Sequence, residues 1–351
     1  MPLTLSVVSA AVGGFAGHTA VHPQVAEAAR GHLATAVVHG VLSDAQVYAV
    51  GDRLALLLAH PHGLDAEPAH RAAFEALTAA AEVAARLHQH GPGRDLMPDA
   101  FTGDLRAAGP AVAEIELTER PSEPLAVFLG SGAAAGSFNL PLARAFADPF
   151  TTPGLVLAEP LHAGFSFEVH DVTLRRKVMF NTPEETYGLL SLIGLSARFE
   201  VRRVVSRTTG EVAAATATAA PVAVVRAHGA FPGLGELTEP YATPHLVDGS
   251  LRGAHIGPWM PVGLADASGG RFDGPPRVVA LALQVAEGRL GEPRDLFADV
   301  SFEGARRQAL EVTDYLRRHG PFTPHRIPLD EVEVTALPPA AARFASRWSN
   351  L

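Results

Sequence analysis

Residues 3–18, LTLSVVSAAVGGFAGH, decide the fold. The run at 3–10 is rich in Leu and Val, which is typical of a buried β-strand. It leads into a glycine-rich turn at 13–17, where glycine lets the backbone approach a ligand closely. His18 follows the turn and could act as an acid, a base or a ligand, but a plain tight turn with a surface histidine explains the same pattern.

Strands and helices alternate outward from this stretch. A helix is expected over 23–38. Pro23 suits its first position, because the N–H that proline lacks would have no hydrogen-bond partner within the helix there. Two strands, 47–50 and 54–59, flank the turn Gly51-Asp52-Arg53. The other expected elements are helices at 65–88, 183–193 and 302–319, and strands at 112–117, 125–129, 155–157, 165–172, 178–180, 199–205, 212–218, 222–225 and 277–285.

This alternation predicts an α/β fold. Glycine and proline are frequent in the connection over 231–276, which we expect to be a long functional loop. Neither a polar linker nor a repeat of fixed period divides the sequence. We therefore expect one large domain over residues 1–351.

Composition excludes several classes of function. Of the 351 residues, 47% are hydrophobic, enough for a large core. The net charge of −9 argues against binding to nucleic acid or to an anionic membrane. Cysteine is absent, which excludes disulfides and thiolate chemistry, and Lys177 is the one lysine. Since the N-terminus lacks a basic segment and the apolar runs are too short for a membrane span, we expect a soluble cytoplasmic protein.

Four polar segments could carry chemistry. Asp52 lies in a turn between two strands, which suits a site, although Asp in a hairpin turn often serves local hydrogen bonding. Arg94 lies in the Gly-Pro-Gly-Arg-Asp run at 91–95 and could hold an anion, or could be a solvated charge at a helix exit. Arginines in the loops at 245–261 and 271–277 could bind phosphate or carboxylate with two parallel hydrogen bonds, or could pack the loops together.

The glycine-rich run at 130–136 imitates a dinucleotide phosphate loop after the strand 125–129. Such a loop must lead at once into a helix, but Asn139-Leu140-Pro141 interrupts the helical pattern. A clear acidic partner about 20 residues further on is also missing. Nucleotide binding is therefore not expected.

Read together, these segments resemble the archaeal-type (class V) fructose-1,6-bisphosphate aldolase/phosphatase family. The likeness is carried by Gly-Gly-x-x-Gly-His at 13–18, Asp-Ala-Phe-x-Gly at 99–103 and Thr-Glu-Arg-Pro-Ser-Glu-Pro at 118–124. It continues at 138–142, 146–150, 162–171, 244–247, 271–280 and 317–322, and spans nearly the whole chain in order. The resemblance implies a four-layer α-β-β-α sandwich, and a homo-oligomer that is usually an octamer.

Much of the chemistry that the resemblance implies is not matched. Family members bind several Mg²⁺ ions through aspartates and a glutamine, and form a Schiff base through a lysine. His18 and Asp52 keep two metal positions. The positions of other ligands and of the Asp-Lys pair hold Ala11, Arg53, Arg94, Ser131 and Gly132. The loop with Tyr-x-x-Lys-Asp-Asp that should precede Pro221 is missing, and Val334 replaces a C-terminal tyrosine.

Because Mg²⁺ requires several oxygen ligands in near-octahedral order, we expect no metal and no cofactor. Part of the substrate side is kept: Gly103, Arg252 and Asp273 match substrate-binding positions of the family. His90 replaces a tyrosine, Asp104 an asparagine, and His228-Gly229 a Gln-Ser pair. A guanidinium can replace the charge of a metal opposite an anion, so Arg53 and Arg94 predict that an anion site is retained.

The favoured hypothesis is a diverged, metal-independent enzyme of specialised metabolism. It would act on a phosphate- or carboxylate-bearing small molecule as an isomerase, lyase or cyclase. His18 and Asp52 would transfer protons, while Arg53 and Arg94 would hold charge. The substrate would be bound by His90, Gly103, Asp104, His228, Gly229, Arg252 and Asp273. Two alternatives stay open: a fructose-1,6-bisphosphate phosphatase/aldolase, and a non-catalytic pseudoenzyme or assembly partner.

Overall fold

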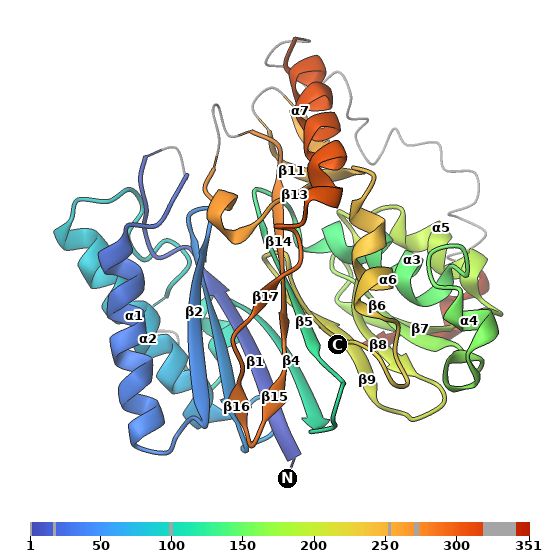
Figure 1. Cartoon of the computed structure of the whole chain (residues 1–351), viewed down its shortest axis with the longest axis horizontal. Helices are drawn as coiled ribbons and strands as arrows, with labels where there is room; N and C mark the ends of the chain where they lie inside the picture. Colours follow the sequence, from blue (N-terminus) through green and yellow to red (C-terminus); the bar gives the residue numbers. More distant parts are fainter. Residues whose placement is uncertain (1, 17–18, 98–100, 252–253, 270–273, 319–341) are drawn as a thin grey trace.

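Two β-sheets face each other in the centre of the protein, and helices cover their outer faces (Figure 1). The computed structural model describes residues 2–16, 19–97, 101–251, 254–269, 274–318 and 342–351. Within these residues the prediction of an α/β fold is confirmed.

The smaller sheet is antiparallel, with the strand order β2-β3-β1-β4. Its strands are β1 (Pro2–Ala10), β2 (Asp44–Val50), β3 (Arg53–His60) and β4 (Ala111–Thr118). β2 and β3 form a hairpin around Gly51-Asp52, which places Asp52 and Arg53 at one end of the sheet.

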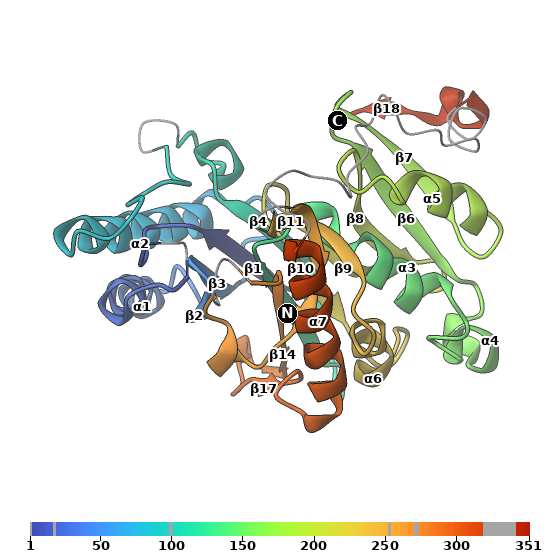
Figure 2. The same cartoon turned by 90° about the horizontal axis from the view of Figure 1, so that it is seen from above.

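The larger sheet has the order β13-β14-β5-β10-β9-β8-β6-β7-β18, with β17 beside β14. β13 runs parallel to β14, and the other pairs described are antiparallel. Its strands are β5 (Leu125–Ser131), β6 (Phe165–Asp171), β7 (Arg176–Asn181), β8 (Phe199–Ser206), β9 (Val212–Thr216), β10 (Val222–Arg226), β13 (Met260–Pro261), β14 (Arg277–Leu283), β17 (Arg294–Asp295) and β18 (Ser349–Asn350). β18 adds the C-terminal residues to the edge of the sheet beside β7 (Figure 2).

Three hydrophobic clusters hold these elements together. The first lies between α1 (Pro23–Val38), α2 (Glu67–Arg86) and the smaller sheet. The second fills the space between the two sheets. The third lies between the larger sheet and the helices α3 (Asn139–Ala147), α5 (Thr186–Ile193) and α6 (Leu234–Thr238).

β1 shows how the sequence builds two of these clusters at once. Leu5 and Val7 point into the space between the sheets, whereas Val8 and Ala10 point toward α1 and α2. A strand buried on both faces reads as a nearly continuous apolar run, which is the pattern of the opening stretch. Each fully buried Leu or Val contributes about 1.5–3 kcal/mol of hydrophobic stabilisation.

Three expectations about local structure are wrong. Residues 155–157, expected as a strand, belong to the short helix α4 (Gly154–Leu157), because three apolar residues are too few for periodicity to decide. The connection over 231–276 contains α6, β13 and the ribbon β11 (Leu246–Leu251) with β12 (Ala254–Pro258).

The third error concerns Asn139-Leu140-Pro141, which begins the helix α3 instead of interrupting one. Pro141 is tolerated there because the first backbone N–H groups of a helix have no intrahelical partner.

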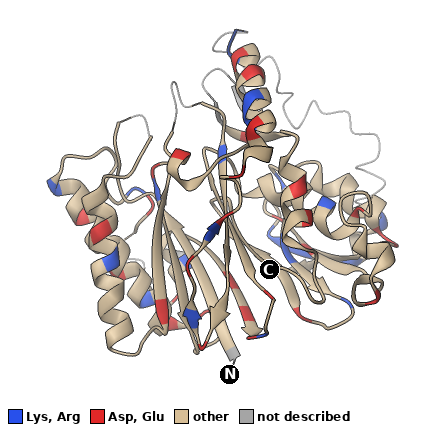
Figure 3. Ribbon diagram, viewed as in Figure 1, with Lys and Arg blue, Asp and Glu red and all other residues tan. Residues whose placement is uncertain are grey.

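The remaining elements are the helix α7 (Glu303–Arg318) and the ribbon of β15 (Val285–Ala286) and β16 (Arg289–Leu290). Acidic and basic residues are interspersed along α7 and scattered over the sheets (Figure 3). Over the described ranges, no helix is both long and apolar enough to span a membrane.

Candidate functional site

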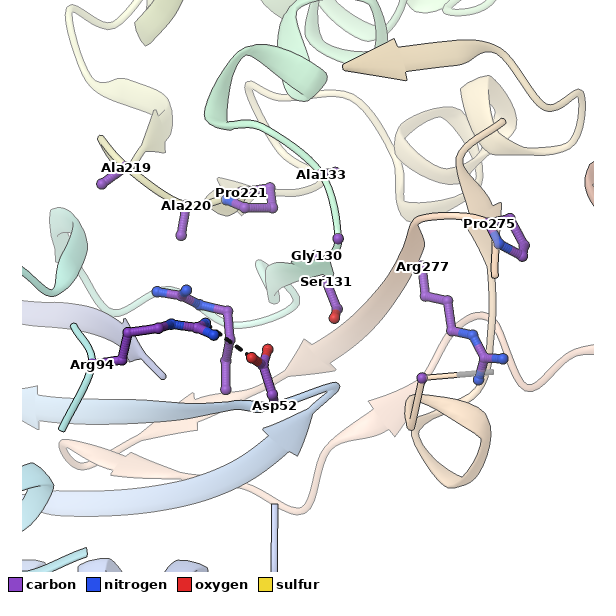
Figure 4. A pocket seen from close by; sticks show the side chains of 13 residues that line it. Asp52, Arg94, Gly130, Ser131, Ala133, Ala219, Ala220, Pro221, Pro275 and Arg277 are labelled. Carbon is purple, nitrogen blue, oxygen red and sulfur yellow. Dashed lines mark hydrogen bonds and ion pairs between the residues drawn. The ribbon is translucent and has the colours of Figure 1, made fainter. Parts of the chain in front are cut away.

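A polar pocket of about 410 Å³ lies where the ends of both sheets meet (Figure 4). The β2–β3 turn contributes Asp52 and Arg53, and the loop after α2 contributes Arg94. The larger sheet contributes the end of β5 with the turn at 130–133, the β9–β10 turn at 219–221, and the start of β14 at Arg277. The pocket thus gathers segments that are far apart in the sequence.

Gly51 brings the two sheets into contact at this pocket. Its φ is +60°, a left-handed conformation that glycine adopts without strain. A Cβ at this position would also collide with the Ser131 side chain of the larger sheet. The N–H of Gly51 donates to the carbonyl of Ala267, at 2.9 Å. Glycine is therefore required here both for the turn and for the close approach that sets Asp52 beside Ser131.

Arg53 is held entirely by groups of the protein. Its Nε donates to Ser9 Oγ at 3.0 Å, and its Nη2 donates to the Ser9 carbonyl at 3.1 Å. Its Nη1 lies 2.7 Å from Asp95 Oδ2, which also accepts a hydrogen bond from the backbone N–H of Ala11. With 15% of its side chain exposed, Arg53 ties β3 to β1 and to the loop after α2.

Arg94 lies nearer to solvent, with 41% of its side chain exposed. Its Nη2 lies 2.9 Å from Asp52 Oδ2, and its Nε lies 3.5 Å from Asp95 Oδ1. Gly91 and Gly93, both with positive φ, shape the loop that carries it. Two arginines and two aspartates therefore form one network whose charges balance.

The structure brings Asp52, Arg53 and Arg94 to one pocket but leaves other predicted site residues elsewhere. His90 exchanges backbone hydrogen bonds with Gly14 on the same loop as Arg94, and it does not line the pocket. Gly103 lies beside Glu67 at the start of α2. Asp104 accepts from the backbone N–H of Arg106 and so caps the short helix 105–108.

The pair His228-Gly229 lies at the opposite end of the strands from the pocket. Both residues have positive φ and follow β10, whose last residue, Arg226, pairs with Leu125 at the start of β5. His18, Arg252 and Asp273 lie outside the described residues.

Two further residues of the pocket, Ser131 and Arg277, were not among the predicted site residues. They are direct partners in the antiparallel register of β5 and β14, and both line the pocket. The Nη1 of Arg277 donates to the carbonyls of Asp266 and Ser268, while its Nε is buried without a hydrogen-bond partner. Burial lowers the pKa of Arg277, and the charge of Asp266 opposes that effect. The sequence did point to the arginines of the loop 271–277 as possible anion ligands, but it did not single out Arg277.

The pocket residues do not fit the Mg²⁺ cluster that the resemblance implies. The carboxylates of Asp52 and Asp95 are already paired with Arg94 and Arg53, and Mg²⁺ requires several oxygen ligands. Within the described part of the chain, no three His, Asp or Glu side chains are placed to share a metal ion.

A Schiff base does not fit this pocket either. The one lysine, Lys177, lies on β7, four strands beyond β10 in the sheet order, and its Nζ is 3.8 Å from Glu168. It is not among the residues that line the pocket.

An α/β fold with a concave polar pocket at the ends of its strands is the arrangement of an enzyme or binding protein for small molecules. The family described as fructose-1,6-bisphosphatase matches residues 2–349, and the chain belongs to this family.

Relatives named fructose-1,6-bisphosphate aldolase/phosphatase are similar over almost the full length. The protein of Moorella thermoacetica is 45% identical over 99% of this chain and 94% of its own length. That of Ignicoccus hospitalis is 48% identical over 98% and 92%. That of Methanothermobacter marburgensis is 43% identical over all of both chains.

These findings support an enzyme family. They support the phosphatase/aldolase alternative better than the favoured hypothesis of an isomerase, lyase or cyclase.

Proposed function

We propose that this chain binds fructose 1,6-bisphosphate in the pocket between the sheet ends and acts on it without a metal ion. The observation that carries the proposal is similarity over almost the full length to relatives named for this substrate, together with a pocket lined by Asp52, Arg94 and Arg277. Arginine suits the recognition of phosphate groups, because its planar fork can donate two parallel hydrogen bonds.

Asp52 is the carboxylate of the pocket that would transfer protons. Only 12% of its side chain is exposed, and Arg94 lies 2.9 Å from its Oδ2. When Arg94 turns toward a ligand anion, the Asp52 carboxylate becomes available to accept a proton, and the guanidinium can stabilise developing negative charge. No step of this proposal passes through Mg²⁺ or a lysine imine, since the pocket residues fit neither.

The test is an assay of the purified protein with fructose 1,6-bisphosphate, measuring release of phosphate and formation of triose phosphates in parallel. We expect turnover that EDTA does not reduce, that Asp52→Asn lowers by about 10²–10⁴-fold, and that the exposed control Glu82→Gln leaves unchanged. Turnover that appears only when Mg²⁺ is added would contradict the metal-independent reaction.

A non-catalytic binding protein is the second candidate function. The balanced pairs Arg94–Asp52 and Arg53–Asp95, and the distance in the fold between Lys177 and the pocket, favour it. Calorimetry with fructose 1,6-bisphosphate, combined with the product assay above, distinguishes the two candidates. A pseudoenzyme would bind the sugar phosphate in the calorimeter and release no product in the assay.

We also infer that residues 1–351 form one domain with four layers, helix–sheet–sheet–helix, and assemble into a homo-oligomer of octamer size in the cytoplasm. The three hydrophobic clusters support the layers. Exposed apolar side chains around α4 and α5, among them Phe150, Leu157 and Tyr187, support the assembly. Light scattering of the purified protein tests it, and the mass of a monomer would contradict it.

A further inference from the structure

We propose that Arg277 and Ser131 form the anion-binding subsite of the pocket, which takes a phosphate group of the ligand. The inference rests on the proposed function, in that the pocket holds a sugar phosphate. It assigns the phosphate contact to a residue pair of the larger sheet and not to Arg53, which the sequence suggested.

The register of the sheet places the two side chains together. Arg277 is the first residue of β14 and Ser131 the last of β5, and they are direct partners in the antiparallel ladder. Side chains of directly opposite residues lie on the same face with their Cβ atoms about 4.5–5.5 Å apart. Both side chains therefore leave the sheet at one wall of the pocket, although the Arg277 guanidinium is turned toward the carbonyls of Asp266 and Ser268 and would have to swing toward Ser131 to share an anion with it (Figure 4). A guanidinium and a hydroxyl both donate hydrogen bonds to anions.

The guanidinium of Arg277 is positioned without being neutralised. Its described hydrogen bonds go to two backbone carbonyls, those of Asp266 and Ser268, which fix its orientation but carry no net charge. Its Nε has no hydrogen-bond partner, so the protein does not saturate this group. The Asp266 carboxylate acts on it electrostatically and not through a described hydrogen bond.

The other two arginines of the pocket differ in this respect. All three nitrogens of Arg53 are engaged, and its charge is paired with Asp95 at 2.7 Å. Arg94 is paired with Asp52 at 2.9 Å, and Figure 4 shows this pair across the pocket from Arg277, with Ser131 between them. A phosphate that binds at Arg53 must break a largely buried ion pair, and at Arg94 it must take the place of Asp52, whereas Arg277 has no ion pair among the described residues to give up.

The experiment measures binding of inorganic phosphate and of fructose 1,6-bisphosphate by calorimetry to the full chain and four variants. Arg277→Met should weaken phosphate binding by about 10–100-fold, the scale of a lost hydrogen bond to a charged group. Arg277→Lys should recover part of the loss, because it restores the charge but not the planar fork. Ser131→Ala should weaken binding by about 3–10-fold, and the exposed control Arg289→Met, on β16 and outside the pocket lining, should leave the phosphate affinity within about twofold.

Thermal unfolding of each variant is measured beside the titration. If Arg277→Met does not fold, Arg277→Lys and Ser131→Ala decide, since both keep polar groups at the site. Phosphate binding that is unchanged in these variants overturns the subsite.

The outcomes separate the subsite from the proposed function. If Arg277 is required for phosphate but fructose 1,6-bisphosphate binds no tighter than phosphate, the subsite stands and the proposed substrate fails. If fructose 1,6-bisphosphate binds equally well without Arg277, the subsite fails and the proposed substrate stands.

Discussion

Two polar networks of the smaller sheet hold charged side chains in opposite environments, one near solvent and one buried. One is the network of Arg53, Arg94, Asp52 and Asp95, which opens on the pocket. The other lies beneath α2 and centres on Glu114 of β4, whose side chain is only 2% exposed. In the first, cations and carboxylates pair near solvent, while in the second a buried carboxylate is surrounded by donors.

The buried network is saturated with hydrogen bonds. Glu114 accepts from Ser6 Oγ at 2.7 Å and from the Asp65 N–H at 3.1 Å, and it lies 3.0 Å from His70 Nε2 and 2.9 Å from Arg106 Nη2. Burial alone would raise the pKa of Glu114, but the hydrogen bonds from His70 and Ser6, with the charges nearby, lower it to about 2.

This difference in burial assigns the two networks different roles: the Glu114 network stabilises the fold, and the Arg94–Asp52 pair can take part in ligand binding. A buried carboxylate with fixed donors loses its whole solvation when one partner is removed, so this network stabilises the fold. A half-exposed ion pair can exchange its partner for a ligand at little cost, so the pocket can respond to an anion. The predictions below test this division, from the largest expected effect to the smallest.

Glu114→Ala should be the most destabilising change. It leaves the side chains of Ser6, His70 and Arg106 without their common acceptor in a buried place. We expect a loss of about 3–5 kcal/mol in the free energy of unfolding, measured by urea denaturation. Asp52→Asn in the pocket is the control and should cost less than about 1 kcal/mol, and equal losses in the two variants would refute the division.

His60 should make the protein sensitive to acid. The His60 ring is buried beside Ser6, and this burial lowers its pKa to about 4. The negative charge of Glu114 acts in the opposite direction but is the smaller effect. The unfolded chain takes up this proton near pH 6.5 and the folded protein only near pH 4, so stability falls as the pH falls between these values. The loss should total roughly 3 kcal/mol.

Unfolding free energies between pH 7 and pH 4 measure this effect. His60→Gln should flatten the profile over that interval, because glutamine does not titrate. A profile of the same slope in the variant would assign the acid sensitivity to other groups.

Arg53 and Arg94 should differ although the sequence treats them alike. Arg53→Met removes three internal contacts and should cost about 1–3 kcal/mol of folding stability. Arg94→Met removes a half-exposed pair and should cost less than about 1 kcal/mol. Thermal or urea unfolding of both variants provides the comparison, and a larger loss for Arg94→Met would reverse the roles.

The sequence predicts local structure well where local signals decide it. The helix 23–38 matches α1 at both ends, because Pro23 suits a first helical position and the side chain of His22 accepts from the N–H of Gln24. The start of α3 was missed. The Asn139 side chain is fixed there by hydrogen bonds with the backbones of Ile193, Phe199 and Val201, which are distant in sequence.

The site shows the same limit. Asp52, Arg53 and Arg94 could be placed together from the resemblance, but not the pairing of Arg53 with Asp95 and Ser9, which depends on how β1, β3 and the loop pack. Arg277 faces Ser131 only through the register of β14 on β5, and a single sequence does not specify that register.

Mg²⁺ should have the smallest effect of all. Millimolar Mg²⁺ should change the midpoint of thermal unfolding by less than about 1 °C, because a ligand stabilises a fold only to the extent that it binds the folded state. Asp52 in the pocket and Asp95 beside it already face guanidinium groups, at 2.9 and 2.7 Å, which a metal ion would have to displace. The measurement is a titration of EDTA-treated protein followed by calorimetry. A midpoint that rises by several degrees, and does so no longer in Asp52→Asn, would place a metal in the pocket and would make Arg94 a group that moves aside for it.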